Sequence, residues 1–137
     1  MLDRNTNILI VDDMMTMRKI VRKALTELGF KNVTEADNGL SAWDRLQAGL
    51  TSTPIQLIIS DWNMPGMNGV ELLAKVRKHA QLSNLTFVLL TAESDKEQVK
   101  QAATLGVSGY IVKPFSAPEL GQKLDALAKA LQSKAVA

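Results

Sequence analysis

Residues 8–15 read ILIVDDMM, in which four aliphatic residues lead directly into a pair of aspartates. An aliphatic run without polar alternation is typical of a strand that is covered on both faces, as in a parallel sheet. Two carboxylates about 4 Å apart repel each other by roughly 4 kcal/mol at an effective dielectric constant near 20. Asp12 and Asp13 therefore predict either a bound cation or a raised pKa at the end of this strand.

Similar short runs recur along the chain, and helical patterns separate them. The predicted strands are 8–11, 32–36, 55–60, 86–90 and 109–112. Apolar residues between 17 and 28 follow helical spacing, and Gly29 predicts the end of that helix. Ser94 with Glu97, and Ser116 with Glu119, have the spacing of capping boxes at later helix starts. Five strands alternating with five helices predict a doubly wound (βα)₅ α/β fold around one parallel sheet.

Composition limits the function classes. A chain of 137 residues with 46% hydrophobic residues can form one domain with its own core, and we expect a single domain over 1–137 with no output domain. Without cysteine it has no disulfide or thiolate ligand. The polar N-terminus and the short apolar runs predict no signal peptide, no membrane span and a cytoplasmic protein.

The charge pattern argues against a nucleic-acid partner. Net charge is only +2 and aromatic residues make up 4% of the chain, so stacking surfaces are scarce. The basic residues that gather in the first predicted helix are expected to form a solvated helix face: Arg18, Lys19, Arg22 and Lys23.

Polar side chains stand at the carboxyl ends of four predicted strands. Asp61 follows the third strand, Thr91 the fourth and Lys113 the fifth, while Asp12 and Asp13 follow the first. Each has a local explanation, such as a helix cap, a turn starter or a solvated residue. Ligands of open parallel sheets bind at this edge, however. Five separate local explanations would not account for the presence of all five polar residues at the same edge, so a shared ligand site is the better explanation.

The three aspartates predict an oxygen-only site for a hard divalent cation, and Mg²⁺ is the expected cofactor. A metal alone leaves Lys113 unexplained, because a cation repels a lysine. A lysine, a hydroxyl group and Mg²⁺ around one carboxylate make sense if that carboxylate becomes phosphorylated. Asp61 is the predicted acceptor, because it stands alone at the end of its strand, and Asp12 and Asp13 form the metal-binding pair.

The chain resembles the response-regulator receiver domains of two-component signalling, and most closely the stand-alone chemotaxis receivers. The resemblance runs from about Ile8 to Leu131. It rests on DD at 12–13, SDWNMPGMNG at 60–69, TAE at 91–93 and GYIVKPF at 109–115. The resemblance implies a flavodoxin-like fold with strand order 2-1-3-4-5.

The resemblance also implies a role for each site residue. Asp61 would accept the phosphoryl group, which Thr91 and Lys113 would bind. The Mg²⁺ ligands would be Asp61, Asp13, Asp12 acting largely through water, and the backbone carbonyl of Asn63. Tyr110 would be a rotameric switch, and the Lys113–Pro114 peptide bond would be cis. The implied output face consists of Lys96, Tyr110, Val112 and Lys123.

The function implied is that of a phosphorylation-activated chemotaxis regulator. A histidine kinase would be the phosphate donor, a flagellar motor switch protein the target, and a dedicated phosphatase a further partner. We expect a monomer without membrane partners that catalyses only its own phosphoryl transfer and its autodephosphorylation. The alternative within the family is a phosphorelay intermediate or a phosphate sink. Asn68, where many receivers have aspartate, and the longer loop LTSTPIQ at 50–56 leave loop-specific partners open.

Two alternatives from other classes share parts of this pattern. A phosphohydrolase of the haloacid dehalogenase type would need a second aspartate two residues after Asp61, where this chain has Asn63. A flavodoxin-type FMN carrier would need a phosphate-cradling first loop rich in serine, threonine and glycine, whereas this loop is acidic.

Five further residues receive local predictions. Met14, Met15 and Met17 are expected to pack locally, since methionine is an adaptable filler, and docking of a partner is the alternative. Trp62 either packs in its turn or stands exposed for a partner. His79 is expected to be a solvated cation at the end of the third helix.

Overall fold

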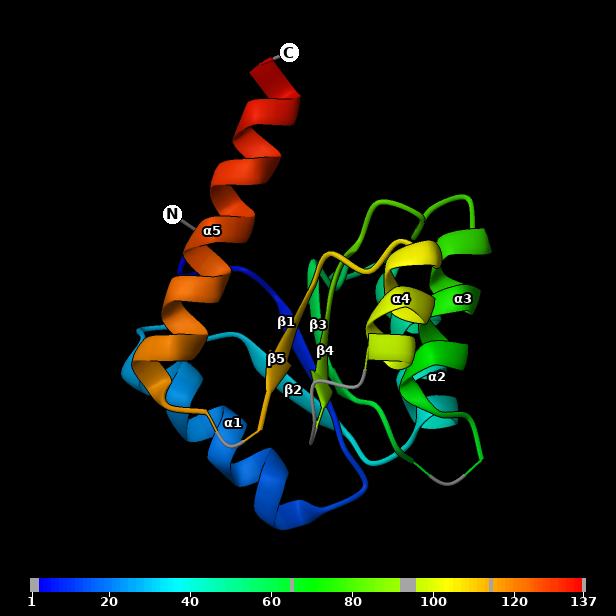
Figure 1. Ribbon diagram of the computed structural model, residues 1–137, viewed down its shortest axis with the longest axis horizontal. Helices are drawn as coiled ribbons and strands as arrows, with labels where there is room; N and C mark the ends of the chain where they lie inside the picture. The colour runs from blue at the N-terminus through cyan, green and yellow to red at the C-terminus, as the bar shows by residue number, and fades with distance from the viewer. Residues whose placement is uncertain (1–2, 65, 92–95, 114, 137) are drawn as a thin grey trace.

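The computed structural model describes residues 3–64, 66–91, 96–113 and 115–136. Its strands are β1 (Ile8–Val11), β2 (Val33–Ala36), β3 (Leu57–Asp61), β4 (Thr86–Thr91) and β5 (Gly109–Val112). Its helices are α1 (Met15–Glu27), α2 (Gly39–Gly49), α3 (Gly69–Lys78), α4 (Lys96–Thr104) and α5 (Ala117–Val136). All strand pairs are parallel, in the order β2-β1-β3-β4-β5, so the predicted fold is confirmed (Figure 1).

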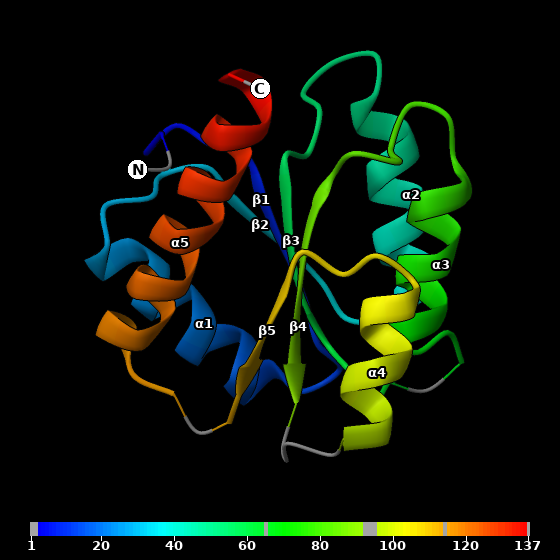
Figure 2. The ribbon, with the colours of Figure 1, turned by 45° about the horizontal axis from the view of Figure 1, so that its top comes forward.

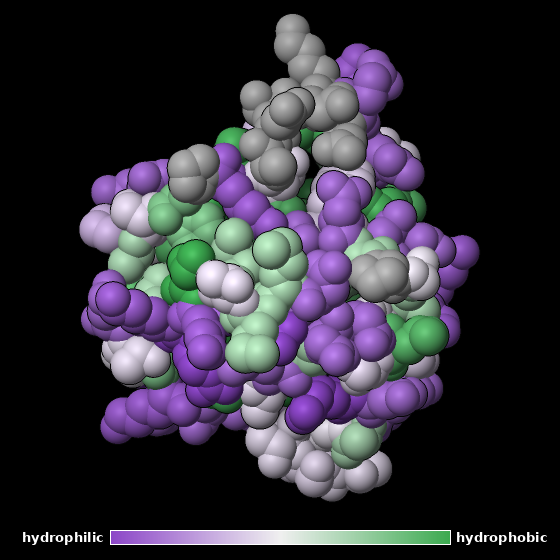
Figure 3. Space-filling model, turned by 90° about the horizontal axis from the view of Figure 1, so that it is seen from below, coloured by the Kyte–Doolittle hydropathy of each residue, from purple (hydrophilic) through white to green (hydrophobic). Residues whose placement is uncertain are grey.

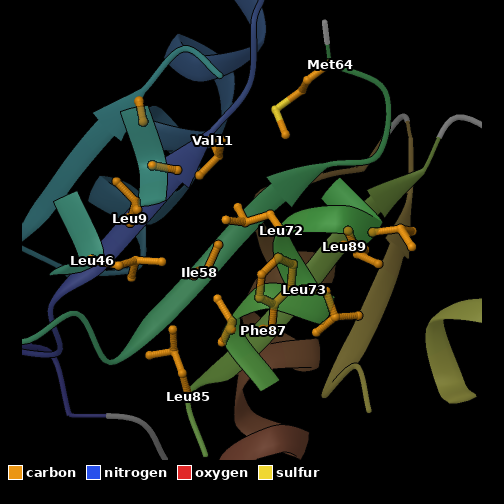
Figure 4. Packing of buried hydrophobic residues seen from close by; sticks show 14 of the residues in the cluster. Leu9, Val11, Leu46, Ile58, Met64, Leu72, Leu73, Leu85, Phe87 and Leu89 are labelled. Atoms are coloured by element: carbon orange, nitrogen blue, oxygen red, sulfur yellow. The ribbon is translucent and has the colours of Figure 1, made fainter. Parts of the chain in front are cut away.

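Helices cover the sheet on both faces. Helices α1 and α5 lie on one face, and α2, α3 and α4 lie on the other (Figures 1 and 2). Alternate residues of β1 serve the two layers: Ile8 and Ile10 pack with α1 and α5, whereas Leu9 and Val11 pack in the second cluster. Figure 4 shows this second cluster, where Leu72 and Leu73 of α3 lie near Phe87 of β4.

Strands β3 and β4 each end one residue later than the sequence pattern predicted. Asp61 is the last residue of β3 and pairs with Leu90, and Thr91 is the last residue of β4 and pairs with Val112. Both were expected to follow their strands. Because they belong to the ladder, the backbone of the sheet fixes their positions.

The helix starts differ in how they are capped. Asn68 caps α3 in a capping box with Glu71, which the sequence analysis did not identify. At α5 the backbone N–H of Glu119 donates to Ser116 Oγ (3.2 Å), as predicted. The predicted cap at Ser94 lies outside the described residues.

Among the described side chains, helix α4 buries fewer than any other helix. Among its described side chains only Ala102 is buried. Its C-terminal end is held by Arg77 of α3, whose guanidinium donates to the carbonyl of Gly106 (2.8 Å) and to Ser108 Oγ (3.2 Å). The same side chain donates to the carbonyls of Ser83 and Leu85. Arg77 thus links the loop between α3 and β4 to the loop between α4 and β5.

Across the part of the chain that is described, no helix combines the length and the apolar character needed to cross a bilayer.

We expect Gly69→Ala to lower the free energy of unfolding by roughly 1–3 kcal/mol, as overpacking does. A Cβ at Gly69 would lie 2.3 Å from the carbonyl oxygen of Asp61 and 2.9 Å from Leu89 Cδ2. Urea unfolding would measure the change. Gly49→Ala is the matched control, because nothing lies closer than 3.8 Å to its Cβ, and its stability should be unchanged or up to about 1 kcal/mol higher. Equal stability of both variants would contradict the close packing of α3 on Asp61.

Candidate functional site

Three carboxylates converge at the carboxyl edge of the sheet, as predicted. One oxygen from each of Asp12, Asp13 and Asp61 lies within 4.8 Å of the others. Asp12 is 1% exposed and Asp61 9% exposed, whereas Asp13 is exposed to solvent. A cavity of about 330 Å³ adjoins Asp13 and is also lined by Asn63, Met64 and Asn68. The cluster is therefore buried at its base and open to solvent on the Asp13 side.

The carboxylate of Asp61 is held by contacts to its Oδ1 atom. The backbone N–H of Trp62 donates to Oδ1 (2.8 Å), and the ammonium group of Lys113 donates to it as well (2.9 Å). Lys113 follows β5, and its backbone N–H donates to the carbonyl of Thr91 (2.7 Å). The predicted convergence of Asp61 and Lys113 is thus confirmed, and the side chain of Lys113 is oriented toward the acidic cluster.

Asp12 carries a buried oxygen without a hydrogen-bond partner. Its Oδ1 accepts from the backbone N–H of Met14 (2.9 Å), whereas Oδ2 has no hydrogen bond to any described residue and lies 3.8 Å from Lys113 Nζ. Burial raises the pKa of Asp12, and the negative charges of Asp61 and Asp13 add to this rise. The Met14 N–H and the Lys113 charge act in the opposite direction but do not cancel it.

This environment suits a divalent cation. The donors are oxygen atoms only, and leaving a buried oxygen unsatisfied costs about 1–3 kcal/mol. A cation between Asp12, Asp13 and Asp61 would satisfy Asp12 Oδ2 and reduce the mutual repulsion that raises the pKa of Asp12. The residues present therefore fit Mg²⁺.

The predicted switch residues lie at the β4 and β5 side of the site. Thr91 is buried, with 5% exposure, at the end of β4. Tyr110 and Val112 project from β5 with 36% and 37% exposure. The ammonium of Lys123 in α5 lies 5.3 Å from the centre of the Tyr110 ring, a cation–π arrangement. The side chain of Lys96 and the predicted cis-proline, Pro114, lie outside the described residues.

Several local predictions were wrong. Met17 packs against the cluster that contains Ile8 and Ile10, as predicted, but Met14 and Met15 do not pack locally, since they are 60% and 59% exposed. Figure 3, which shows the molecule from below, shows that apolar (green) and polar (purple) residues lie side by side on this face. Trp62 is 8% exposed and packs in the core, so the exposed alternative is wrong. His79 is not simply solvated, because its ring packs edge-on against Trp43 at 5.7 Å and Nδ1 accepts from the Gln81 N–H.

The predicted solvated basic face is confirmed for Lys19, Arg22 and Lys23, which are exposed, but it is wrong for Arg18, whose side chain is 16% exposed. Arg18 Nε and Arg22 Nε donate to the two carboxylate oxygens of Glu35 in β2, at 3.1 and 2.6 Å. Burial alone would raise the pKa of Glu35, but the two arginines outweigh that effect and hold it below its usual range. The sequence predicted the helix that carries Arg18 and Arg22 and the strand 32–36 that carries Glu35, but it did not indicate that these side chains would meet.

Comparison with known proteins identifies the family. Residues 8–125 match the sequence profile described as the response regulator receiver domain. The chain belongs to this receiver family. The receiver is 48% identical over 124 residues to the chemotaxis protein CheY-3 of Vibrio cholerae, which covers 90% of this chain and 92% of that protein. It is 45% identical over 118 residues to the chemotaxis protein CheY of Pseudomonas aeruginosa, covering 86% and 92%.

A solved structure agrees with the sequence comparisons. The chemotaxis response regulator CheY4 of Vibrio cholerae superimposes with a TM-score of 0.80 and 31% identity, covering 90% of this chain and 98% of that one. The receiver is therefore that of a CheY-like response regulator, and its relatives associate it with chemotaxis.

The raised pKa of Asp12 predicts how the stability of the metal-free receiver depends on pH. The folded state holds the Asp12 proton to higher pH than the unfolded chain, whose carboxyl group titrates near its ordinary 3.8. This group therefore lowers the free energy of unfolding as pH rises above 3.8, until Asp12 is ionised in the folded state too. In Asp12→Asn this contribution is absent.

Urea unfolding in EDTA, at several pH values between about 4 and 8, would measure this effect. We expect the stability of Asp12→Asn relative to wild type to increase with pH. At neutral pH in EDTA, Asp12→Asn should be more stable than wild type. In high Mg²⁺ wild type should be the more stable of the two, because the cation stabilises only a protein that binds it. If the stability difference between wild type and Asp12→Asn in EDTA did not change with pH, the raised pKa assigned to the buried Asp12 carboxyl group would be wrong.

Proposed function

We propose that this protein is a phosphorylation-activated, single-domain regulator of chemotaxis that accepts a phosphoryl group on Asp61. The observation that carries the proposal is the ion pair between Lys113 Nζ and Asp61 Oδ1 beside a buried, unsatisfied oxygen of Asp12. A lysine that pairs with one carboxylate of an acidic cluster is suited to bind a phosphoryl group on that carboxylate. The names of the relatives support chemotaxis as the process.

The two described contacts of the Asp61 carboxylate engage Oδ1, so Oδ2 is the oxygen left to attack phosphorus. As the new P–O bond forms, the bond from phosphorus to the donor breaks, and the histidine of the kinase, or acetate from acetyl phosphate, leaves with the bonding electrons. The Trp62 N–H and Lys113 hold the carboxylate in place, which lowers the entropic cost of reaching an attacking geometry. Asp12, Asp13, Asp61 and the backbone carbonyl of Asn63 would hold Mg²⁺. When bound, the cation would supply the positive charge that a dianionic phosphoryl group needs beside three carboxylates.

After transfer, Lys113 and Thr91 would bind the phosphoryl oxygens. Thr91 is buried at the end of β4, one strand from Asp61, and its carbonyl already receives the backbone N–H of Lys113. A hydroxyl group attracted by phosphoryl oxygens would pull on the β4 end, next to the lightly anchored helix α4. Tyr110, which is half-exposed on β5, would then turn inward, and the surface of Tyr110, Val112, Lys123 and Lys96 would change.

This surface would be the means of output. We place the protein in the cytoplasm as a monomer that receives phosphate from a histidine kinase and acts on a flagellar motor switch protein. A dedicated phosphatase would be a further partner, and its own catalysis would be limited to phosphoryl transfer onto Asp61 and autodephosphorylation. A phosphorelay intermediate or phosphate sink would use the same site without a motor partner.

Acetyl phosphate with Mg²⁺ should add one acid-stable, base-labile phosphoryl group, which mass spectrometry of the intact protein would detect as one added phosphate. Asp61→Asn should accept none, because it lacks the nucleophilic carboxylate. Asp12→Asn is the matched control, since it removes a carboxylate from the same cluster but leaves the acceptor. We expect it to be phosphorylated at least tenfold more slowly, as for loss of a metal-site group. Peptide mapping of the phosphate to Asp12 or Asp13 in wild type would reverse the assigned roles.

Binding of the output partner should depend on the activated state. We expect the protein with beryllofluoride and Mg²⁺, which mimic the phosphorylated site, to bind a flagellar motor switch protein at least tenfold more tightly than without them, corresponding to about 1.4 kcal/mol of coupling. Surface plasmon resonance would give both affinities. Thr91→Ala, the control for coupling, should bind beryllofluoride but gain little affinity for the partner. Equal partner affinity with and without beryllofluoride in wild type would favour the phosphate sink.

A further inference from the structure

The turn that presents Asp12 lacks the usual support of a helix start. Met14 stands at the N-cap of α1 and its side chain makes no capping hydrogen bond. Asp12 is instead held through its own groups. Its N–H donates to the carbonyl of Ala36 (3.2 Å), and its Oδ1 accepts from Met14 N–H (2.9 Å). Its carbonyl oxygen accepts from Arg18 Nη1 (2.8 Å).

Arg18 is the one side chain in this set that connects Asp12 to another strand. Its Nη1 donates to the Asp12 carbonyl while its Nε donates to Glu35 Oε1 in β2 (3.1 Å). Both donors belong to a planar, rigid guanidinium group, so the spacing between the two partners is fixed by the geometry of one side chain. The side chain of Arg18 is only 16% exposed, which limits competition from water.

The charge of Arg18 is not what acts on the Asp12 carboxyl group. The charges that shift its pKa are those of Asp61, Lys113 and Asp13, and the positive charge of Arg18 is paired with Glu35. What Arg18 provides is direction. A hydrogen bond to the carbonyl fixes the peptide plane that follows Asp12 and, with the Met14 N–H bond to Oδ1, the direction of Oδ2.

We infer that Arg18 is a positioning residue of the metal site, which orients the Asp12 carboxylate toward Asp13 and Asp61 while Glu35 holds Arg18 in place. The inference rests on the proposed function, because it assigns Arg18 a role toward the Mg²⁺ that this function requires. Groups that orient metal ligands typically change metal affinity by about 10- to 100-fold when they are removed.

Arg22 provides a matched control. It lies one turn further along α1 and donates to the other oxygen of the same Glu35 carboxylate (2.6 Å), as well as to the carbonyl of Val33. It makes no hydrogen bond to Asp12 among the interactions of the described chain. Replacing Arg22 therefore removes a similar ion pair between α1 and β2 but leaves the contact to Asp12 intact.

The experiment is a Mg²⁺ titration of wild type, Arg18→Ala and Arg22→Ala, followed by tryptophan fluorescence and by the midpoint of thermal unfolding. We expect Arg18→Ala to raise the Mg²⁺ dissociation constant about tenfold or more, and Arg22→Ala to change it less than about twofold. Both variants should lose similar stability in EDTA. If Arg18 had only a structural role, the two variants would differ neither in stability in EDTA nor in Mg²⁺ affinity. A loss of Mg²⁺ affinity in Arg18→Ala alone therefore indicates a positioning role.

Equal Mg²⁺ affinity of wild type and Arg18→Ala, or equal weakening in both variants, would overturn the inference. If Arg18→Ala fails to fold, Arg18→Lys takes its place. A single ammonium group cannot reproduce the two-point contact, so weaker Mg²⁺ binding is expected and wild-type affinity would overturn the inference. Failure of the proposed function gives a different result, because wild type itself would then show no Mg²⁺-dependent shift.

Discussion

Three carboxylates held at the carboxyl edge of one sheet, with a single lysine ammonium group directed at them, are the constraint on which the site depends. Lys113 forms a close ion pair with Asp61 but stands 3.8 Å from the buried oxygen of Asp12. The internal cation therefore compensates one carboxylate well and another poorly. The fold maintains this imbalance because the strands that carry the residues are fixed by the core. Because Asp12 and Asp61 are buried and Asp13 is open to solvent, a cation can enter from the Asp13 side and compensate the remaining negative charge.

Aliphatic runs and the polar residues after them were enough to predict the (βα)₅ fold class and the sheet edge where Asp12, Asp13, Asp61 and Lys113 meet, whereas the strand order came from the family resemblance. Short aliphatic runs predicted the strands, and the polar residues that follow them predicted the edge at which a ligand would bind. The pair at 12 and 13 was predicted to need a cation or a raised pKa at the end of its strand. In the structure the strand ends at Val11, and both aspartates lie in the loop that follows, Asp12 buried and Asp13 exposed.

The contacts that depend on spatial register could not be predicted in the same way. Glu35 pairs with Ile10 across β1 and β2, and this register brings its carboxylate next to two arginines of α1. Nothing in the sequence spacing of residues 18 and 35 indicates that contact. The exposure of Met14 and Met15 also could not be predicted from local spacing, because it depends on which neighbouring elements cover the start of α1. Pattern reasoning describes faces of single elements, and neighbouring elements decide which faces are covered.

The attachment of α4 determines how any displacement of that helix would be distributed along it. Arg77 holds the carbonyl of Gly106 and the hydroxyl of Ser108, both just beyond the C-terminal end, and Ala102 is the buried contact near that end. A helix of nine residues is about 13 Å long at 1.5 Å per residue. Fixed at one end, it behaves as a lever: a tilt of about 10° displaces the far end by about 2 Å while the pivot stays in place. Because Arg77 fixes the C-terminal end of α4, a small tilt of the helix displaces its residues by distances that increase toward the start of the helix.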